Sequence, residues 1–462
     1  MIGSVAAMDA STSYSNTDSQ NKMSLIGPQN PKNAFKTMPC SKRISMYDVC
    51  IVGAGMIGSA TAKHLSEISR TGKKICLIGP SEPKNRYNAT ERDIFGSYYD
   101  EGRIARATDS NPVWAKLAKR SIAAYKKLEQ QSGIQFFSEA GYVVIAKNDS
   151  TCIKETIAAS KSCHAEFEVL DSKGSKKQFP FLNITDDDQC IFEKESSGHV
   201  SPRKLVQALR LVAKQNGCDI IDEVVDDIRE ITDNNAERFS EITLSSGQKL
   251  FSHKVLLATG AFTTFRNLLP KHVEPDVNLK SATVLRVEID DHDAASLRNM
   301  PSIYFNQEES QCLPHNVLRR MYILPPIRYP DGKIYIKIGC SGSDLKITLT
   351  TAREMADWFR GQGYPGAKVP LLTTLQHVVK GFTPRSTTLD TCVTTTTPTS
   401  RLYIDMLSPT LGVALGGNGW AAKSCIEIGK IAALMVTSDS GHWTYDIPRE
   451  NFLFTPKTIS KL

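Results

Sequence analysis

The sequence predicts an α/β fold in which a Rossmann-like nucleotide-binding sheet is interleaved with a second, strand-rich domain. The first observation is a strand–helix–strand pattern, because apolar runs at 48–52 and 74–78 flank a glycine-rich turn and a helical segment. The second is a pair of later patterns, an apolar run at 254–261 and a strand–helix pattern at 412–436. Both predict strands that return to the same sheet. The third is the strand-rich pattern from about 275 to 380, which indicates the second sheet.

The glycine-rich turn predicts a nucleotide-binding site of Rossmann type. It comprises six consecutive residues, Gly53, Ala54, Gly55, Met56, Ile57 and Gly58. Gly53 permits the tight turn, Gly55 lets the backbone approach a pyrophosphate, and Gly58 lets the helix pack closely on the strand. The helix that follows points its unpaired N–H groups at the phosphates. The pattern is specific here because it lies inside a βαβ unit of about 30 residues.

The acid that usually ends the second strand of such a unit, where it holds the ribose hydroxyls, is displaced in this chain. Gly79 follows Ile78, and Glu82 comes three residues later. Two interpretations stay open: Glu82 reaches back to the ribose, or it is a solvated acid of the loop.

The other elements follow from periodicity in chain order. Apolar residues at helical spacing predict helices at 112–132 and 202–216. Apolar runs and alternation predict strands at 141–146, 219–225, 282–289, 320–325 and 333–339.

The composition argues against several functional classes. A net charge of +7 over 462 residues is modest, and no basic run is interleaved with aromatics, so nucleic-acid binding is not expected. No stretch of 18 apolar residues predicts a membrane span. The 11 cysteines form no C-x-x-C pair and no His/Cys cluster with zinc spacing, so we expect no metal site and a reducing compartment.

The two ends of the chain carry different signals. Residues 1–46 are polar and aperiodic, without the apolar core of a signal peptide, and predict a disordered leader. The last three residues are Ser460, Lys461 and Leu462. A C-terminal SKL is an address read by the peroxisomal import receptor, so the sequence predicts a peroxisomal protein with that receptor as a partner.

Three motifs in this order carry a resemblance to a known family. GAGMIGS at 53–59, LLATGAF at 256–262 and GVALGGNGW at 412–420 resemble the FAD contacts of the D-amino-acid-oxidase-like flavoprotein superfamily. The sequence is most similar to the group of monomeric sarcosine oxidase and peroxisomal sarcosine/pipecolate oxidase, over roughly residues 47–440. The resemblance implies a Rossmann-like FAD-binding domain interleaved with a substrate domain of α+β type, built on a mixed sheet. The FAD-binding parts are 47–135, 198–275 and 385–440, and the substrate-domain parts are 136–197 and 276–384.

The same resemblance implies further FAD contacts outside the first turn. These are Val200, Gly260, Gly416, Gly417, Asn418 and Gly419.

Two arginines three residues apart resemble the family's arginine pair. There the first, Arg103 here, lies beside the flavin ring, and the second, Arg106, binds the substrate carboxylate. A guanidinium suits a carboxylate because it offers two parallel charge-assisted hydrogen bonds. From the residues alone, both remain open to a simpler interpretation as surface charges or ion-pair partners.

The segment from Cys392 to Pro398 resembles the family's Cys-x-Tyr-x-x-Thr-Pro stretch, whose cysteine can carry a covalent thioether to the flavin. A thiolate is the nucleophile that this attachment requires. Thr394 stands where the family usually has tyrosine. Cys392 is therefore either the attachment point or an inert buried cysteine, and FAD is expected in both cases.

Lys337 resembles the family lysine that lies over the flavin and activates oxygen. A fixed cation stabilises the negative charge that O₂ develops as it accepts an electron. By its alternating pattern alone, Lys337 would face solvent. Tyr322 corresponds to a family tyrosine that lines the substrate cavity, and Ser341 replaces an active-site histidine, which argues against sarcosine itself as the substrate.

The last loop departs from the family at its lysine. Ala421 stands in register with the family's second carboxylate-binding lysine, and Lys423 comes two residues later, roughly half a helical turn away. Lys423 is the candidate for that role, and the sequence leaves open whether its side chain points toward the substrate.

Together these features predict an FAD-dependent amine oxidase that converts a secondary amino acid, N-methylated or cyclic, to an imine and reduces O₂ to H₂O₂. Two alternatives remain: a flavin dehydrogenase that uses another electron acceptor, and a non-catalytic FAD-binding protein.

Overall fold

The computed structural model describes residues 46–68, 72–340, 345–438 and 443–457. Almost all of the predicted leader and the whole of the predicted targeting tripeptide lie outside these residues. The first strand begins at Met46, one residue inside the predicted leader. Among the described residues, no helix has both the length and the apolar character needed to cross a membrane.

The first sheet is the predicted nucleotide-binding sheet, in which parallel strands are extended by antiparallel pairs of β10 with β11, β11 with β12 and β18 with β19. Its strands run in the order β10-β11-β12-β1-β2-β9, and β19 joins β12 and β18. Parallel pairing joins β1 to β2 and β12, β12 to β19, and β2 to β9, which confirms the predicted return of the later segments. Its bounds are β1 Met46–Val52, β2 Ile75–Ile78, β9 Asp219–Ile221, β10 Val225–Thr232, β11 Arg238–Leu244, β12 Lys249–Leu257, β18 Tyr403–Met406 and β19 Leu411–Leu415.

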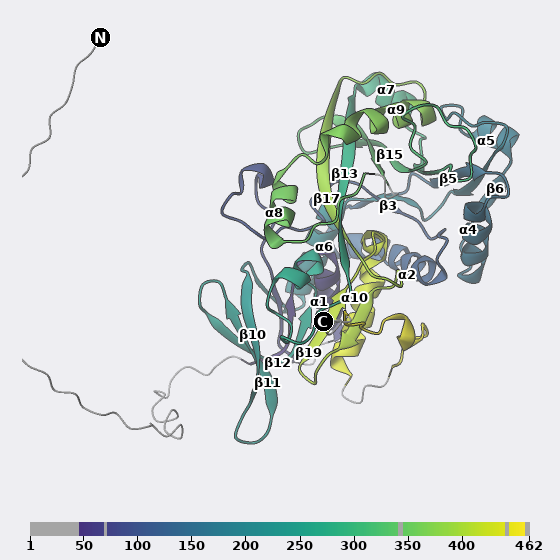
Figure 1. Cartoon of the computed structure of the whole chain (residues 1–462). Coiled ribbons are helices and arrows are strands. Elements are labelled where there is room, and N and C mark those ends of the chain that lie inside the picture. Colours follow the sequence, from purple (N-terminus) through teal and green to yellow (C-terminus); the bar gives the residue numbers. More distant parts are fainter. Residues whose placement is uncertain (1–45, 69–71, 341–344, 439–442, 458–462) are drawn as a thin grey trace, which may run out of the picture. The chain divides into compact units, whose positions relative to one another are not determined.

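Strand β1 is buried on both faces, as its continuous apolar sequence indicates. Val49 and Ile51 pack in one core with the helices, and Cys50 and Val52 pack in a second core with β10 to β12. Helix α1 (Met56–Ile68) lies against both α6 (Pro202–Gln215) and α10 (Ala421–Thr437), near the sheet in Figure 1.

The helix predicted at 112–132 is instead two helices, α2 (Pro112–Ala123) and α3 (Tyr125–Ser132). The break at Ala124 lets Tyr125 turn into the core, where it stacks edge-on with Phe136. Helical spacing continued across the break, so the pattern alone did not reveal it.

The second sheet is mixed, as predicted. Its order is β17-β13-β16-β15-β14-β5-β7-β6, and the β14–β5 pair is parallel while the others are antiparallel. Its bounds are β5 Tyr142–Lys147, β6 Glu168–Leu170, β7 Asp188–Glu193, β13 Asn278–Ile289, β14 Ser302–Asn306, β15 Arg320–Arg328, β16 Ile334–Cys340 and β17 Ser386–Thr396.

Strand β17 differs from the expected division of the chain. It belongs to the 385–440 segment, which we assigned to the FAD-binding domain, yet it pairs along β13 in the second sheet. The two long strands run side by side in Figure 1. Hydrogen bonding to β13 decides its sheet, and this pairing joins residues about 100 positions apart, from Glu288 with Ser386 to Asn278 with Thr396.

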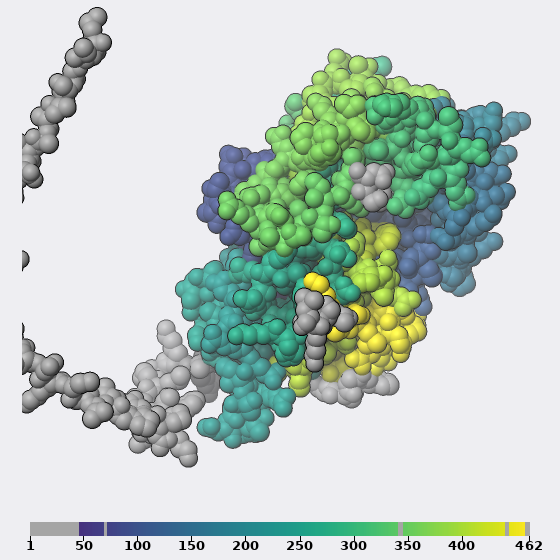
Figure 2. Space-filling view, in the orientation of Figure 1, coloured from purple at the N-terminus to yellow at the C-terminus, as the bar shows by residue number. Residues whose placement is uncertain are grey.

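A small third sheet carries the arginine pair. It has the order β3-β8-β4, formed by β3 (Arg103–Ala105), β8 (Gly198–Val200) and β4 (Phe137–Ser138). The remaining helices are α4 Thr151–Ser162, α5 Ser172–Gln178, α7 Asp291–Ser296, α8 Ala352–Arg360 and α9 Lys368–Val378. Residues 44–462 form one compact unit, and Figure 2 shows that segments far apart in the sequence contribute to one face of it.

Candidate functional site

A groove follows the edge of the first sheet at which its parallel strands end. Nucleotides bind at the carboxyl ends of strands in open α/β sheets. Predicted cofactor contacts that line this groove are Gly53, Ala54, Gly55, Met56, Ile57, Gly260, Gly416, Gly417 and Gly419. The fold therefore brings the three glycine-bearing segments to one surface.

The glycines of the first turn have the geometry that their predicted roles need. Gly53 has φ +111°, and a Cβ there would overlap the Ala258 carbonyl. A Cβ on Gly58 would overlap the Gly53 carbonyl, so Gly58 serves close packing and does not line the groove. A Cβ on Gly55 would meet no atom within 4 Å. The backbone at Gly55 is thus open to the groove, and the turn fits a pyrophosphate.

Two predicted contacts do not reach the groove. Glu82 is held by Arg203, whose Nε and Nη2 atoms each donate to one carboxylate oxygen at 2.7 Å. Val200 is fully buried in a hydrophobic core. Residues 223–225 line the groove instead, because they follow β9, the parallel neighbour of β2. Neither Glu82 nor Val200 lines the groove, so their contact with FAD stays a prediction. The ion pair of Glu82 and the strand neighbours that bring residues 223–225 to the groove cannot be read from local sequence.

The side chain of Asn418 hydrogen-bonds to the backbone of its own loop and of the segment at Thr397. Asn418 adopts φ +51°, its Oδ1 accepts from the Thr397 N–H at 2.9 Å, and its Nδ2 donates to the Gly416 carbonyl. Its side chain is therefore engaged by the protein, although the residue borders the second cavity.

That second cavity, the pocket, lies beside the groove and has a volume of about 620 Å³. This size lies within the range of small-molecule sites. Its lining includes the predicted residues Arg103, Arg106, Tyr322, Cys392 and Lys423. Groove and pocket share Arg103, Thr394, Cys392, Gly419 and Ala422, so they meet at these residues.

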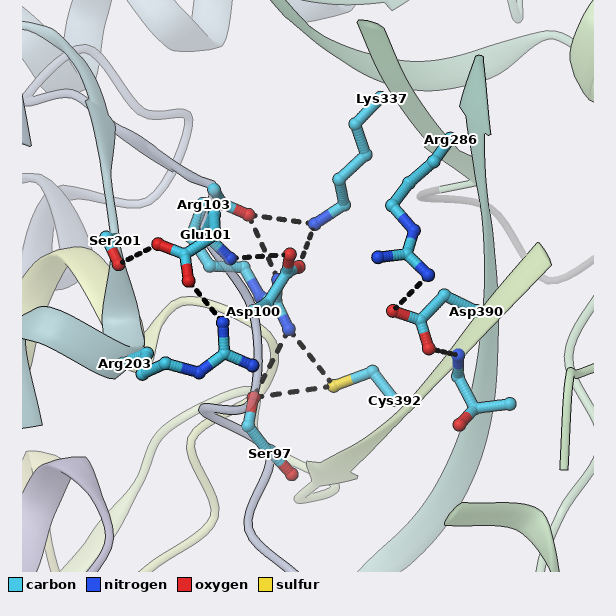
Figure 3. A network of polar contacts seen from close by, with 12 residues as sticks. Ser97, Asp100, Glu101, Arg103, Ser201, Arg203, Arg286, Lys337, Asp390 and Cys392 are labelled. Atoms are coloured by element: carbon cyan, nitrogen blue, oxygen red, sulfur yellow. Dashed lines mark hydrogen bonds and ion pairs between the residues drawn. The ribbon is translucent and has the colours of Figure 1, made fainter. Parts of the chain in front are cut away.

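The first charged cluster at this junction joins Arg103 and Lys337 through Asp100 (Figure 3). Arg103 Nη1 and Lys337 Nζ both donate to Asp100 Oδ2, and Tyr329 Oη donates to Oδ1 at 2.9 Å. Lys337 Nζ also donates to the Gly102 carbonyl at 2.8 Å. Lys337 is completely buried, so it does not face solvent as its pattern alone would suggest. It lines neither cavity, and burial lowers its pKa well below the usual range.

Cys392, on β17, points toward the same junction. Arg103 Nη2 donates to Cys392 Sγ at 3.6 Å, and the thiol lies 3.8 Å from the Ser97 carbonyl (Figure 3). Its side chain is partly exposed and borders both cavities. A sulfur in this position is accessible to a group bound in the groove.

The second charged cluster joins Arg106 and Lys423 through Asp109. Arg106 Nη1 donates to Asp109 Oδ2 at 2.7 Å, and Lys423 Nζ donates to the same oxygen at 2.5 Å. The Arg106 guanidinium also lies over the Tyr142 ring, 4.9 Å from its centroid. Lys423 thus points into the pocket wall despite its shift in register. Asp109 was missed by the sequence analysis, although the spacing Arg103-x-x-Arg106-x-x-Asp109 was available.

Tyr322 lines the pocket and lies over Lys337, whose Nζ is 5.7 Å from the ring centroid. Burial raises the pKa of Tyr322 to about 12. Gly339 makes room for this ring, because a Cβ there would lie 2.5 Å from Tyr322 Oη. Ser341 lies outside the described residues.

Comparisons with known proteins agree with this arrangement. A family model described as "FAD dependent oxidoreductase" matches residues 48–435. A monomeric sarcosine oxidase from Arthrobacter sp. (strain TE1826) is 24% identical over 405 residues, which cover 86% of this chain and 94% of that protein. A monomeric sarcosine oxidase from Streptomyces avermitilis is 26% identical over 174 residues, 38% of this chain and less than half (42%) of that protein.

Among solved structures, the open form of NikD, described as an unusual amino acid oxidase essential for nikkomycin biosynthesis, has the same fold. The TM-score is 0.67 at 18% identity, with 90% of this chain and 99% of NikD covered.

Proposed function

This chain belongs to the family of FAD-dependent oxidoreductases, and we propose from this premise that it is an amine oxidase acting on a secondary amino acid, N-methylated or cyclic. The product is an imine, and O₂ is reduced to H₂O₂. The observation that carries the proposal is the junction at Arg103 and Cys392, where a groove that fits FAD meets a pocket lined by cations. The similarity to sarcosine oxidases supports the amine as the group oxidised.

The residues of the pocket suit an amine that reacts in its neutral form. Bound FAD supplies the chemistry, because it accepts a hydride equivalent from the amine and passes electrons to O₂. Asp100 is engaged by Arg103 and Lys337. Burial alone would raise the pKa of Asp109, yet Arg106 and Lys423 hold it at about 2. Neither Asp100 nor Asp109 is therefore poised as a base, and direct hydride transfer from a deprotonated amine needs no base from these two residues.

A turnover screen with peroxide detection tests the proposal. The panel holds sarcosine, longer N-methyl amino acids, pipecolate and primary amines. Amine-dependent H₂O₂ would support the oxidase. Flavin bleaching without oxygen, combined with slow reoxidation in air, would identify a dehydrogenase. A flavin that no amine bleaches would leave a non-catalytic FAD-binding protein.

Covalent attachment of FAD through Cys392 is part of the proposal, supported by the place of this partly exposed cysteine in the lining of both groove and pocket. Acid precipitation of the wild-type protein is expected to leave flavin in the pellet. Cys392→Ala should release it to the supernatant, whereas Cys152→Ala, a change at a cysteine that borders only the pocket, should not. Free flavin from the wild type would rule out the covalent bond and leave FAD binding intact.

We also propose that the protein works in the peroxisome, where catalase removes H₂O₂. The support is the terminal tripeptide Ser460-Lys461-Leu462. Removing these residues, or blocking them with a C-terminal fusion, is expected to keep the protein in the cytosol with unchanged activity in vitro. The measurement is fluorescence microscopy of an N-terminally tagged protein beside a peroxisomal marker. Peroxisomal retention of the truncated protein would point to another signal.

A further inference from the structure

A third cavity lies apart from the groove and the pocket. It has a volume of about 570 Å³ and shares no lining residue with either of them. Its lining includes residues of β8, the start of α6, the segment that follows α7, and the end of β15. The proposed function places neither FAD nor the amine in this cavity.

The N-terminus of helix α6 lies at this third cavity, because its N-cap residue Ser201 and Lys204 of its first turn both belong to the lining. A helix N-terminus carries a partial positive charge, so acids stabilise a first turn and cations destabilise it. The first turn of α6 has no acid and carries both Arg203 and Lys204. This turn is therefore unfavourable for the helix unless negative groups lie close to it.

Arg203 has such negative partners within the fold, whereas Lys204 has none. Arg203 forms ion pairs with Glu82 and Glu101, and Glu101 also accepts from Ser201 Oγ at 2.9 Å (Figure 3). Both carboxylate oxygens of Glu101 are thereby engaged. Among the described residues, no hydrogen bond or ion pair reaches the ammonium of Lys204, which is exposed. The helix end thus lacks a counter-charge on the side of the third cavity.

Two arginines add to the positive charge of the third cavity. Arg328 pairs with Asp291 at 2.7 Å. The guanidinium of Arg298 is exposed and, within the described ranges, has no hydrogen-bond or ion-pair partner. The lining therefore holds three cations, Lys204 included, against the single carboxylate of Glu101. Such an excess of one sign attracts ligands of the opposite charge.

The wall of the third cavity also contains an imidazole nitrogen without a partner. His199 is 9% exposed, and in the described part of the chain its buried Nδ1 forms no hydrogen bond. Burial, together with the nearby charge of Lys337, lowers the pKa of His199 to about 4, so the ring is neutral near pH 7. A neutral imidazole with its proton on Nδ1 can donate to an anion. An oxyanion at this wall would supply the missing acceptor.

We propose that the third cavity is a binding site for a small oxyanion, a carboxylate or a phosphate. Lys204, Arg298 and the N-terminus of α6 attract the anion, and His199 donates a hydrogen bond to it. The anion supplies the counter-charge that the first turn of α6 lacks. This site goes beyond the proposed function, because it lies outside the groove and the pocket.

Isothermal titration calorimetry of the FAD-loaded, full-length protein tests the site with two probes, inorganic phosphate and acetate. The titrations are made near pH 7 and at low ionic strength, because salt screens exposed charges. Binding of at least one probe is expected, and the tighter probe identifies the site as one for phosphates or for carboxylates. Acetamide, the uncharged counterpart of acetate, should not bind.

Variants assign the binding to the third cavity and not to the cations of the pocket. Lys204→Gln and Arg298→Gln should each weaken binding by about tenfold, a typical effect of losing one charged partner. His199→Phe keeps a ring of similar size and should weaken binding by roughly as much. Lys214→Gln is the matched control, because it removes an exposed lysine from the last turn of α6 that lines none of the three cavities. Its affinity should equal that of the wild type.

Three results would overturn the inference. Neither probe binds, or Lys204→Gln or a folded His199→Phe binds as tightly as the wild type, or Lys214→Gln weakens binding as much as Lys204→Gln does. Should His199→Phe fail to fold, Lys204→Gln and Arg298→Gln still decide, because both replace exposed side chains. The titrations involve no turnover, so their outcome is separate from success or failure of the proposed amine oxidation.

Discussion

Replacing Gly55 with valine is expected to give a folded but colourless protein. A Cβ at Gly55 meets no atom within 4 Å apart from its chain neighbours, so the fold is expected to tolerate a side chain there. The added side chain would occupy the open groove, where the backbone must approach the pyrophosphate of FAD. The measurements are flavin absorbance of the purified protein and thermal unfolding of the FAD-free forms of wild type and variant.

Gly58→Val is the matched control for this prediction. A Cβ at Gly58 overlaps the Gly53 carbonyl, so this variant should lose thermal stability even without FAD. The pair separates a glycine needed for the cofactor from one needed for the fold. A yellow, active Gly55→Val protein would show that the turn does not hold the phosphates.

The second large effect is expected at Lys337. In Lys337→Met, flavin reduction by the amine should stay largely intact, while reoxidation by O₂ should slow by about 10²–10³-fold, the typical cost of losing one preorganised charge. Lys337 is joined through Asp100 to Arg103, which lies at the junction of groove and pocket. Anaerobic reduction followed by mixing with aerated buffer measures the two half-reactions separately.

Lys346→Met serves as the control here, because it removes a cation that lines the pocket and contacts neither Asp100 nor Arg103 in the described structure. The FAD content and thermal stability of both variants must first be compared with those of the wild type, since removing Lys337 deprives buried Asp100 of one partner. Slower reduction would assign Lys337 a contact with substrate. Equal reoxidation rates would remove it from the oxygen reaction and favour the dehydrogenase.

The glycine turn shows how much local sequence can determine. The roles of Gly53, Gly55 and Gly58 were predicted from their spacing, and the backbone at each has the geometry expected. These roles depend on residues within one βαβ unit, where neighbours in sequence are neighbours in space. Most strands of the two sheets were predicted for a similar reason, because apolar periodicity reports burial strand by strand. The mixed pairing of the second sheet was implied by the family resemblance instead.

What only the tertiary structure decided was the pairing between distant segments. Arg103, Arg106, Lys337 and Lys423 were predicted as candidate site residues, but the contacts by which Asp100 and Asp109 each join two of them appear only in the folded structure. The sequence also left Glu82 open as a ribose ligand, while the fold pairs that acid with Arg203. The local sequence determines the type of each side chain and the hydrophobic period of the segment that carries it. Which charge neutralises a charged side chain is set by strands and helices that meet only after folding, because the cost of burying a charge is met by whichever partner the fold brings within reach.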